Sequence, residues 1–554
     1  MPGPHVMPAA RLARIGAPKG KSQFPAPGAI LRFAEKPVSF VSLFTLICFR
    51  KDQTMTLMHY IGGSEAAGTS GRAQDVFNPA TGQAVTSVPL ASADEVQAAV
   101  AAAKAALPGW SNTPAAKRAQ VMFNFRDLIK ANLDELARLI SSQHGKTFDD
   151  AKGEVARGLE VVEFACGIPH ALKGEYSPQV AGGVDVYSLR QPVGVVAGIT
   201  PFNFPAMVPM WMFPMALACG NTFVLKPSER DPGAPMMLAR LMSEAGAPDG
   251  VMNVVNGDKE AVDAILDHPD IGAISFVGST PIGHYIYSRG TANGKRVQAL
   301  CGAKNHMIIM PDADMDQAVD AAMGAAYGSA GERCMAISAV LAVGDDTADR
   351  FVQQLAPKVR ALKIGQYDEP GVEMGPVITA DAKARIEGYI DQGEKDGVDV
   401  VVDGRGLKLQ GYEDGFFVGG TLLDRVTPDM SVYRDEIFGP VLSVLRPQSY
   451  EEARQLVIDH EYGNGTAIFT RDGDAARDFT SNVNVGMVGV NVPIPVPVAY
   501  HSFGGWKASM FGDHSIHGME GVRFYTKLKT VTARWPSGIK EGAVFNFHSG
   551  SDTN

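Results

Sequence analysis

The segment GSAGERCMAIS, residues 328–338, places one cysteine, Cys334, directly behind an arginine, Arg333. A fixed cation lowers the pKa of a neighbouring thiol and favours the thiolate, which is the nucleophilic form. A lone cysteine among small residues is more often a small buried apolar side chain. The pair therefore allows two interpretations, a catalytic nucleophile or a packing residue, which the rest of the chain has to separate.

Two other polar residues have the same ambiguity. Arg157 lies in GEVARGLE, where Glu154 and Glu160 stand at helical spacing and could simply pair with it on a surface. Asn203 lies in TPFNFP, where an asparagine could only terminate a turn. An arginine could instead bind an acid group, and an asparagine amide could stabilise an oxyanion.

Two segments have features of nucleotide binding. In AISFVGSTPIG, Gly278 and Ser279 follow an apolar strand, and Pro281 is expected at the first position of the next helix. The free N–H groups of a helix start favour an anion, although an ordinary strand–turn–helix connection explains this segment equally well. In FVLKPSE, Lys226 and Glu229 stand at the carboxyl end of a strand, where such sheets bind ligands. A carboxylate there would bind ribose hydroxyls and repel a 2'-phosphate.

Short apolar strands that alternate with helices would position these residues. From about residue 193 the chain reads VGVVAGI, NTFVLKP, VMNVVNG and AISFVGS, each followed by a helical stretch. This alternation predicts parallel βαβ units, and strands apolar on both faces predict a sheet covered on both sides. We therefore expect an α/β fold with a doubly wound nucleotide-binding domain, followed by a second α/β region at residues 304–511.

Three helices are predicted before that domain. Ser92 and Glu95 form a capping box ahead of an alanine-rich helix that is expected to stop at residues 108–109, PG. Thr113 and Pro114 start a second helix, whose apolar positions continue to Ile140. A third covers GEVARGLEVVEFA.

The composition is that of an ordinary globular protein large enough for two or three domains, with 554 residues, 45% hydrophobic and 20% charged. A net charge of -10 without a basic stripe argues against a nucleic-acid partner. Residues 191–225 lack charges, but prolines and glycines interrupt them too often for a membrane span. The cysteines show neither CxxC nor Cys/His spacing, which predicts a reducing compartment and no zinc site. They are Cys48, Cys166, Cys219, Cys301 and Cys334.

The first 54 residues differ from the rest, with many basic residues followed by the apolar run VSFVSLFTLICF. The run is short, ends in Arg50 and Lys51, and has no small-residue cleavage site behind it. We expect a non-native or non-essential extension before a start at Met55, and a cytoplasmic protein. The alternative is a transit peptide and a mitochondrial protein.

Six motifs, ITPFNFP, VLKPSE, FVGSTPIG, GERC, DEIFGPV and HSFGGWK, follow one another between about Tyr60 and Trp535. Their order and spacing closely resemble the aldehyde dehydrogenase superfamily. The resemblance implies that Cys334 attacks an aldehyde carbon, and that Asn203 and the Cys334 backbone N–H form the oxyanion hole. It implies NAD as the cofactor and no metal. The cofactor-binding residues that it implies are Thr200, Phe202, Lys226, Glu229, Gly278, Ser279, Glu436 and Phe438.

The resemblance also implies a division into an NAD domain, a catalytic domain and a small oligomerisation element. The NAD domain would comprise residues 55–176 and 193–303, and the catalytic domain residues 304–511. A hairpin at 177–192 and the segment 512–536 would form the oligomerisation element, which implies a homodimer or homotetramer. Residues 1–54 would be an extension and residues 537–554 a tail.

One departure from the superfamily pattern concerns Leu300 in VQALCGAKNH, where most members have a glutamate that activates water. Leucine cannot act as a general base, so the thioester is expected to resist hydrolysis. A thiol acceptor needs less help than water because it is intrinsically nucleophilic near neutral pH, which points to coenzyme A as co-substrate.

The motifs GAKNH, GSAGERC and GMEGVRFYTKLKTVTARW resemble one branch, the CoA-acylating methylmalonate-semialdehyde dehydrogenases. In that branch the arginines that match Arg157 and Arg333 bind the substrate carboxylate. The implied reaction converts malonate or methylmalonate semialdehyde, NAD and CoA to acetyl-CoA or propionyl-CoA, CO2 and NADH. A hydrolytic dehydrogenase for another aldehyde, or a catalytically silent protein on the same fold, are the alternatives.

Overall fold

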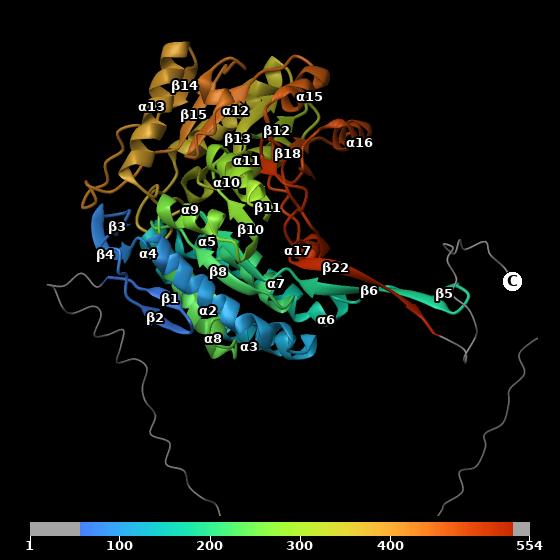
Figure 1. Cartoon of the computed structure of the whole chain (residues 1–554). Helices are drawn as coiled ribbons and strands as arrows, with labels where there is room; N and C mark the ends of the chain where they lie inside the picture. The colour runs from blue at the N-terminus through green and yellow to red at the C-terminus, as the bar shows by residue number, and fades with distance from the viewer. Residues whose placement is uncertain (1–55, 536–554) are drawn as a thin grey trace, which may run out of the picture. The chain divides into compact units, whose positions relative to one another are not determined.

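The computed structural model describes residues 56–535, which build two large sheets with helices packed against them (Figure 1). The first sheet has eight strands in the order β2-β1-β9-β8-β7-β10-β11-β21. Strands β7 to β11 pair in parallel, as the alternation of strands and helices predicts. The bounds are β1 His59–Ile61, β2 Ser64–Ala66, β7 Val195–Ile199, β8 Thr222–Lys226, β9 Met252–Val254, β10 Ile271–Val277, β11 Arg296–Leu300 and β21 Met510–Phe511.

Helices α2 to α10 pack against this first sheet. A β-hairpin precedes them in the chain. The helices are α2 Ala93–Ser111, α3 Ala115–Ala131, α4 Leu133–His144, α5 Phe148–Cys166, α6 Ile168–Ala171, α7 Met207–Ala218, α8 Gly233–Glu244, α9 Lys259–Asp267 and α10 Thr280–Ala292. The hairpin pairs β3 Ala73–Asn78 with β4 Gln83–Pro89. The α/β fold and the four strands predicted from residue 193 onward are confirmed.

The predicted helix ends need three corrections. Helix α2 does not stop at Pro108 but continues to Ser111, because buried Trp110 anchors its last turn and donates from Nε1 to the Leu217 carbonyl at 2.9 Å. The predicted helix from Thr113 to Ile140 is two helices, since the Asn132 side chain donates to the Leu128 carbonyl at 2.8 Å and its backbone leaves the helical region. Helix α10 begins at Thr280, so Pro281 occupies its second position rather than its first.

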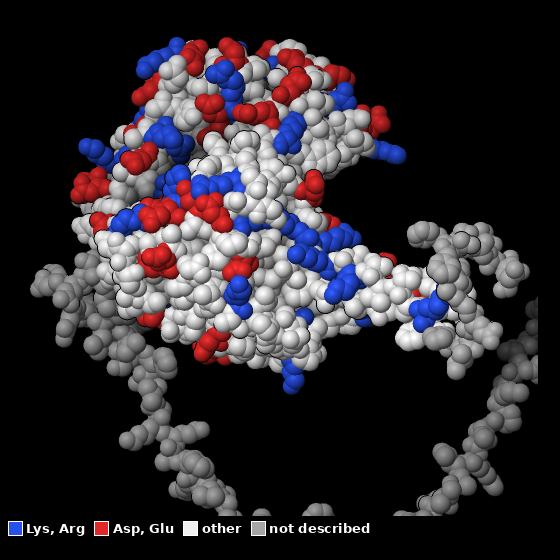
Figure 2. Space-filling model, viewed as in Figure 1, with Lys and Arg blue, Asp and Glu red and all other residues white. Residues whose placement is uncertain are grey.

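The second sheet has seven strands in the order β14-β15-β16-β13-β12-β18-β19. Its strands are β12 Asn305–Ile309, β13 Ile337–Ala342, β14 Asp399–Val402, β15 Thr421–Asp424, β16 Val441–Leu445, β18 Gly465–Phe469 and β19 Met487–Val490. The helices of this part are α11 Met315–Tyr327, the short 3-10 helix η1 Gly328–Gly331, α12 Asp345–Arg360, α13 Ala380–Asp396, α14 Ser431–Arg434, α15 Tyr450–Asp459 and α16 Gly473–Asn482. On the face shown in Figure 2, acidic and basic side chains are intermixed over these helices.

After the second sheet the chain returns to the first. Strand β21 pairs antiparallel with β11, so that Met510 lies opposite Leu300. Two-residue strands β17 Tyr462–Gly463 and β20 Trp506–Lys507 form a small pair, and α17 spans Gly518–Phe524.

A third sheet extends from the body of the described chain as an arm (Figure 1). It has the order β22-β6-β5, with bounds Thr526–Arg534, Val184–Pro192 and Tyr176–Ala181. Tyr176 and Leu528 on this arm are 61% and 60% exposed, which is unusual for large apolar side chains. None of the helices in residues 56–535 is long and apolar enough to cross a membrane.

Candidate active site

A tight backbone turn precedes Cys334 in the connection between α11 and β13. Ser329, Ala330 and Gly331 have φ values of 54°, 51° and 71°, all in the left-handed region. A Cβ on Gly331 would lie 2.1 Å from the Gly439 carbonyl oxygen, so this position accepts only glycine. The small residues of GSAGERC are therefore explained by the path of the backbone rather than by the thiol.

Two asparagine amides fix the backbone of the cysteine. The Cys334 carbonyl accepts from Asn305 Nδ2 at 2.9 Å and from Asn464 Nδ2 at 3.1 Å. Asn305 is the first residue of β12 and Asn464 directly precedes β18, so the ends of two neighbouring strands hold the turn. In the sequence, Asn305 stands out only as part of GAKNH, and no local signal distinguishes Asn464.

The Cys334 thiol is in its neutral form at neutral pH. Burial raises its pKa to about 11, and the nearby Glu436 carboxylate acts in the same direction. Backbone N–H groups and then Arg333 oppose this shift, with Arg333 the smallest of these effects. The proximity of Arg333 alone thus does not activate the thiol.

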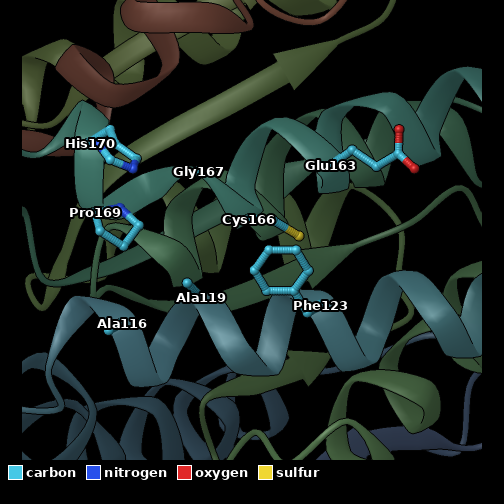
Figure 3. A pocket seen from close by; sticks show the side chains of 8 residues that line it. All are labelled: Ala116, Ala119, Phe123, Glu163, Cys166, Gly167, Pro169 and His170. Carbon is cyan, nitrogen blue, oxygen red and sulfur yellow. The ribbon is translucent and has the colours of Figure 1, made fainter. Parts of the chain in front are cut away.

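The other cysteines of the described chain, Cys166, Cys219 and Cys301, are free and buried. Burial raises the pKa of the Cys166 thiol to about 11 and that of the other two to about 12. Cys166 lines a pocket between α3 and the start of α6, where Figure 3 shows it beside the Phe123 ring. None of the predicted site residues lines this pocket, so it is separate from the candidate active site.

Asn203 lies in the segment between β7 and α7 and is 4% exposed. Its backbone carbonyl accepts from Lys146 Nζ at 2.6 Å. The adjoining Phe204 packs in the same apolar cluster that Cys334 contacts. The oxyanion segment and the cysteine loop therefore share one core.

Both arginines that are predicted to bind the substrate carboxylate already donate hydrogen bonds to other residues of the chain. Arg333 Nη2 donates to Asp150 Oδ1 at 2.5 Å. Arg157 donates to Glu160 at 2.8 Å and to the Pro497 carbonyl at 2.8 Å. The surface pairing with Glu160, which the sequence left open, thus occurs together with a contact to the loop after β19.

The predicted cofactor residues of β7 and β8 meet at the carboxyl ends of these strands. The Thr200 N–H donates to the Lys226 carbonyl at 3.1 Å, and Lys226 Nζ donates to Glu229 Oε2 at 3.1 Å. Burial works to raise the pKa of Glu229, but Lys226 and hydrogen bonds outweigh it and leave that pKa lowered. The carboxylate is therefore charged at neutral pH and able to accept hydroxyl donors.

The start of α10 provides a second part of this edge. Ser279 is the N-cap residue, and its side chain makes no capping hydrogen bond. Gly278 ends the strand connection, where a Cβ would lie 2.5 Å from the Phe276 ring. The helix start thus presents backbone N–H groups that the Ser279 side chain does not cap, which suits an anion.

The DEIFGPV motif brings Glu436 against the loop after β11. Glu436 Oε1 accepts from the Ala303 N–H at 3.0 Å, and a Cβ on Gly302 would lie 2.7 Å from Oε2. Burial raises the pKa of Glu436 to about 7. Phe438, with φ 54°, packs edge-to-face on Phe202 with ring centroids 5.9 Å apart. Two predicted cofactor residues from distant parts of the chain are thereby in contact.

Leu300 ends β11 and is 7% exposed, between Val277 of β10 and Met510 of β21. Its side chain packs in the same apolar cluster that Cys334 contacts. The strand end that precedes Gly302 thus offers an apolar group.

Sequence reasoning missed three charged residues, Lys146, Asp150 and Glu154. Each contacts a segment that carries a predicted site residue. Because charged side chains are most often solvated, nothing in their local pattern distinguished them. Glu154 was considered only as a partner of Arg157.

Comparisons with known proteins agree with this geometry. The model of the Aldehyde dehydrogenase family matches residues 66–531. The chain therefore belongs to the aldehyde dehydrogenase family, and the resemblance read from the six motifs is confirmed.

Individual relatives show which members of the family this chain is similar to. A malonate-semialdehyde dehydrogenase of Pseudomonas aeruginosa is 60% identical over 89% of this chain and 99% of its own length. A methylmalonate-semialdehyde/malonate-semialdehyde dehydrogenase [acylating] of Rattus norvegicus, named as mitochondrial, is 50% identical over 88% of this chain and 91% of its own. Among solved structures, a methylmalonate-semialdehyde dehydrogenase from Sinorhizobium meliloti 1021, complexed with NAD, is 60% identical with a TM-score of 0.88. That match covers 89% of this chain and all of the other.

Proposed function

We propose that this protein oxidises methylmalonate semialdehyde or malonate semialdehyde with NAD and CoA, giving propionyl-CoA or acetyl-CoA, CO2 and NADH. The observation that carries the CoA dependence is Leu300, an apolar side chain at the strand end where a hydrolytic member of the family has its base. The names of the relatives support the same reaction, and the term acylating in the rat protein's name supports CoA as acceptor.

Cys334 begins the reaction by losing its proton and attacking the aldehyde carbon. Because the free thiol has a pKa of about 11, deprotonation has to accompany ligand binding or the attack itself. The product is a thiohemiacetal whose oxyanion we assign to the Asn203 amide and the Cys334 N–H. The two asparagines on the Cys334 carbonyl fix the peptide that directly follows the one carrying this N–H.

The residues at the carboxyl ends of β7, β8 and β10 fit NAD. The Thr200 hydroxyl is buried without a hydrogen-bond partner among the described residues, as expected of a group that awaits a polar ligand. Glu229 suits a ribose and the start of α10 a pyrophosphate, while Glu436 and Phe438 would hold the nicotinamide end. When bound, NAD accepts the hydride that the thiohemiacetal carbon releases.

The thioester formed on Cys334 has a carboxylate on its α-carbon. Loss of CO2 breaks the bond to that carboxylate and leaves an enolate, which the same oxyanion hole stabilises until the α-carbon takes up a proton. The CoA thiol then attacks the thioester carbonyl and releases the Cys334 thiol. Arg157 and Arg333 are proposed to bind the substrate carboxylate before it is lost, since arginine is suited to paired contacts with carboxylates.

The cellular context is part of the proposal. The exposed apolar side chains of the three-stranded arm suit a homodimer or homotetramer contact. We propose a cytoplasmic location, with a mitochondrial one as the alternative, since the rat relative is named as mitochondrial. The domain boundaries remain predictions, and the predicted extension at residues 1–54 and tail at residues 537–554 lie outside the described residues.

NADH formation from malonate semialdehyde, with and without CoA, tests the function when the acyl product is identified by mass. We expect sustained turnover only with CoA, and acetyl-CoA with one CO2 for each NADH. Full turnover without CoA and a free acid as product would favour a hydrolytic dehydrogenase instead.

A further inference from the structure

A buried ion pair lies against the segment that carries Asn203. Lys146 Nζ is 2.8 Å from Glu154 Oε2, and both side chains are 0% exposed. Lys146 follows α4 and Glu154 lies in α5. Burying two charges costs desolvation free energy that their attraction often does not recover, so such a pair is weak evidence for a role in stability alone.

The remaining hydrogen bonds of the pair all go to residues 203–207. Lys146 Nζ donates to the Asn203 carbonyl at 2.6 Å and lies 4.4 Å from the centre of the Phe204 ring. Glu154 Oε1 accepts from the N–H groups of Ala206 at 2.8 Å and Met207 at 3.1 Å. The lysine thus holds the carbonyl of Asn203, and the glutamate holds the first turn of α7 just behind it.

Three titratable groups around the pair have pKa values shifted toward their neutral forms. Burial raises the pKa of Asp231 well above its usual value and lowers that of His144 well below it. Burial raises the pKa of Glu332 to about 8. Each shift favours the neutral form of its group, and within residues 56–535 Lys146 and Glu154 form no salt bridge except with each other, at 2.8 Å.

Glu154 lies on one face of α5 together with two other site contacts. Asp150, Glu154 and Arg157 are spaced four and three residues apart, which places them on the same side of a helix. Asp150 contacts Arg333, Glu154 contacts residues 206–207, and Arg157 contacts the Pro497 carbonyl. One helix therefore contacts three segments, namely the loop that carries Cys334, the start of α7 and the loop after β19.

We propose that Lys146 and Glu154 are positioning residues that hold the backbone of Asn203 so that its side-chain amide faces the oxyanion. This inference rests on the proposed role of Asn203. A shift of the 203–207 backbone by a fraction of an ångström would misalign the amide, and oxyanion stabilisation depends steeply on such alignment.

A double-mutant cycle tests this coupling, with the rate of the first NADH burst measured at saturating NAD and malonate semialdehyde. We expect Lys146→Met and Glu154→Gln each to lower the burst rate about 10- to 100-fold, which is less than the roughly 100- to 1,000-fold cost of losing a whole oxyanion donor. In an Asn203→Ala background the same changes should cost less than about 3-fold, because no amide remains to be positioned. The loss of thermal stability should be the same in both backgrounds.

Lys130→Met and Glu163→Gln are matched controls, since this exposed pair joins α3 to the same helix α5 at 2.8 Å. They should leave the burst rate unchanged. If Lys146→Met does not fold, the Glu154→Gln variant alone tests the inference. This variant is expected to fold because the glutamine oxygen can still accept from the Ala206 N–H.

Equal fold-losses in both backgrounds would overturn the inference and reduce the pair to a structural role, as would an unchanged burst rate in the folded single variants. If Asn203→Ala itself leaves the burst rate unchanged, the assignment of the oxyanion hole fails first and this inference fails with it. The two failures are thus distinguished by the single Asn203 variant.

Discussion

Arg333 Nη2 and Asp150 Oδ1 lie 2.5 Å apart, so an arginine proposed to bind the substrate carboxylate already holds a carboxylate of the protein. Both side chains are 21% exposed. Apart from a long contact of Nη1 to the Gly324 carbonyl at 3.4 Å, the guanidinium makes no further hydrogen bond within residues 56–535. Asp150 thus orients Arg333, and its negative charge offsets the positive charge of the guanidinium.

Replacing Asp150 by asparagine separates these two effects. The amide oxygen can still accept from Nη2, while the competing negative charge is removed. We expect KM for malonate semialdehyde to fall about 2- to 5-fold and KM for propanal, which has no carboxylate, to stay unchanged. Asp150→Ala is the comparison that also removes the orientation. A higher KM in the asparagine variant would mean that Arg333 needs the charge of Asp150.

The arginines themselves should discriminate between the same two substrates. Arg157→Ala and Arg333→Ala are each expected to raise KM for malonate semialdehyde about 10- to 100-fold, because one charge-assisted contact to the carboxylate is lost. The KM for propanal should change less than about 3-fold. Steady-state kinetics on both aldehydes check this, and equal losses on the two substrates would contradict carboxylate binding.

Leu300→Glu restores the residue type that most of the superfamily has at the end of β11. We expect CoA-independent NADH formation, with the free acid as product, to rise at least about 10-fold above that of the unchanged protein. Leu300→Gln places a similar polar side chain there without a base and should give no such increase. If the two variants behave alike, Leu300 does not explain the choice of acceptor.

Glu436→Gln should make Cys334 easier to ionise. The Glu436 carboxylate helps to raise the pKa of the Cys334 thiol, so a neutral side chain there lowers that pKa. Inactivation of the free enzyme by iodoacetamide, followed from pH 7 to 10.5, is expected to shift to lower pH and to be severalfold faster at pH 8. Cys334→Ser confirms that the reaction reports this thiol. An unchanged profile would show that Glu436 does not act on the cysteine.

Glu332→Gln should change the dependence of stability on pH. Burial raises the pKa of Glu332 from 4.5 to about 8, so the folded protein retains a proton that the unfolded chain releases above pH 4.5. The contribution of Glu332 to stability is therefore present below pH 4.5 and is lost as the pH rises toward 8. We expect the Tm of the variant, relative to the unchanged protein, to increase by about 2 °C or more between pH 5 and pH 8. A constant difference would contradict the raised pKa.

The sequence predicted the strands that carry the cofactor residues because their apolar runs and flanking glycines are local signals. Helix ends were less predictable, since Trp110 and Asn132 act through contacts that depend on tertiary structure or on one side-chain choice. The same limit applies to the site. Cys334, Asn203 and Glu436 lie in recognisable motifs, whereas Lys146 and Glu154 show their role only when α5 and α7 have packed together.

Arg333 shows a different limit. Its position beside Cys334 suggested thiol activation or carboxylate binding, and the structure adds Asp150, which lies 183 residues earlier. Only the folded chain shows that burial and Glu436 outweigh Arg333 at the thiol. Adjacency in sequence thus overestimated the electrostatic effect of one residue and missed its partner.

The pairing of β21 with β11 also fixes when the site can be completed during synthesis. The strand that ends in Leu300 cannot pair with β21 until Met510 and Phe511 have been synthesised. In the same way, β6 cannot pair with β22 until that strand has been synthesised. A nascent chain that has emerged only as far as residue 500 therefore exposes two unpaired strand edges beside its cofactor and arm segments. Such edges can pair with other chains, so this stage of biogenesis is where protection by a chaperone would matter most.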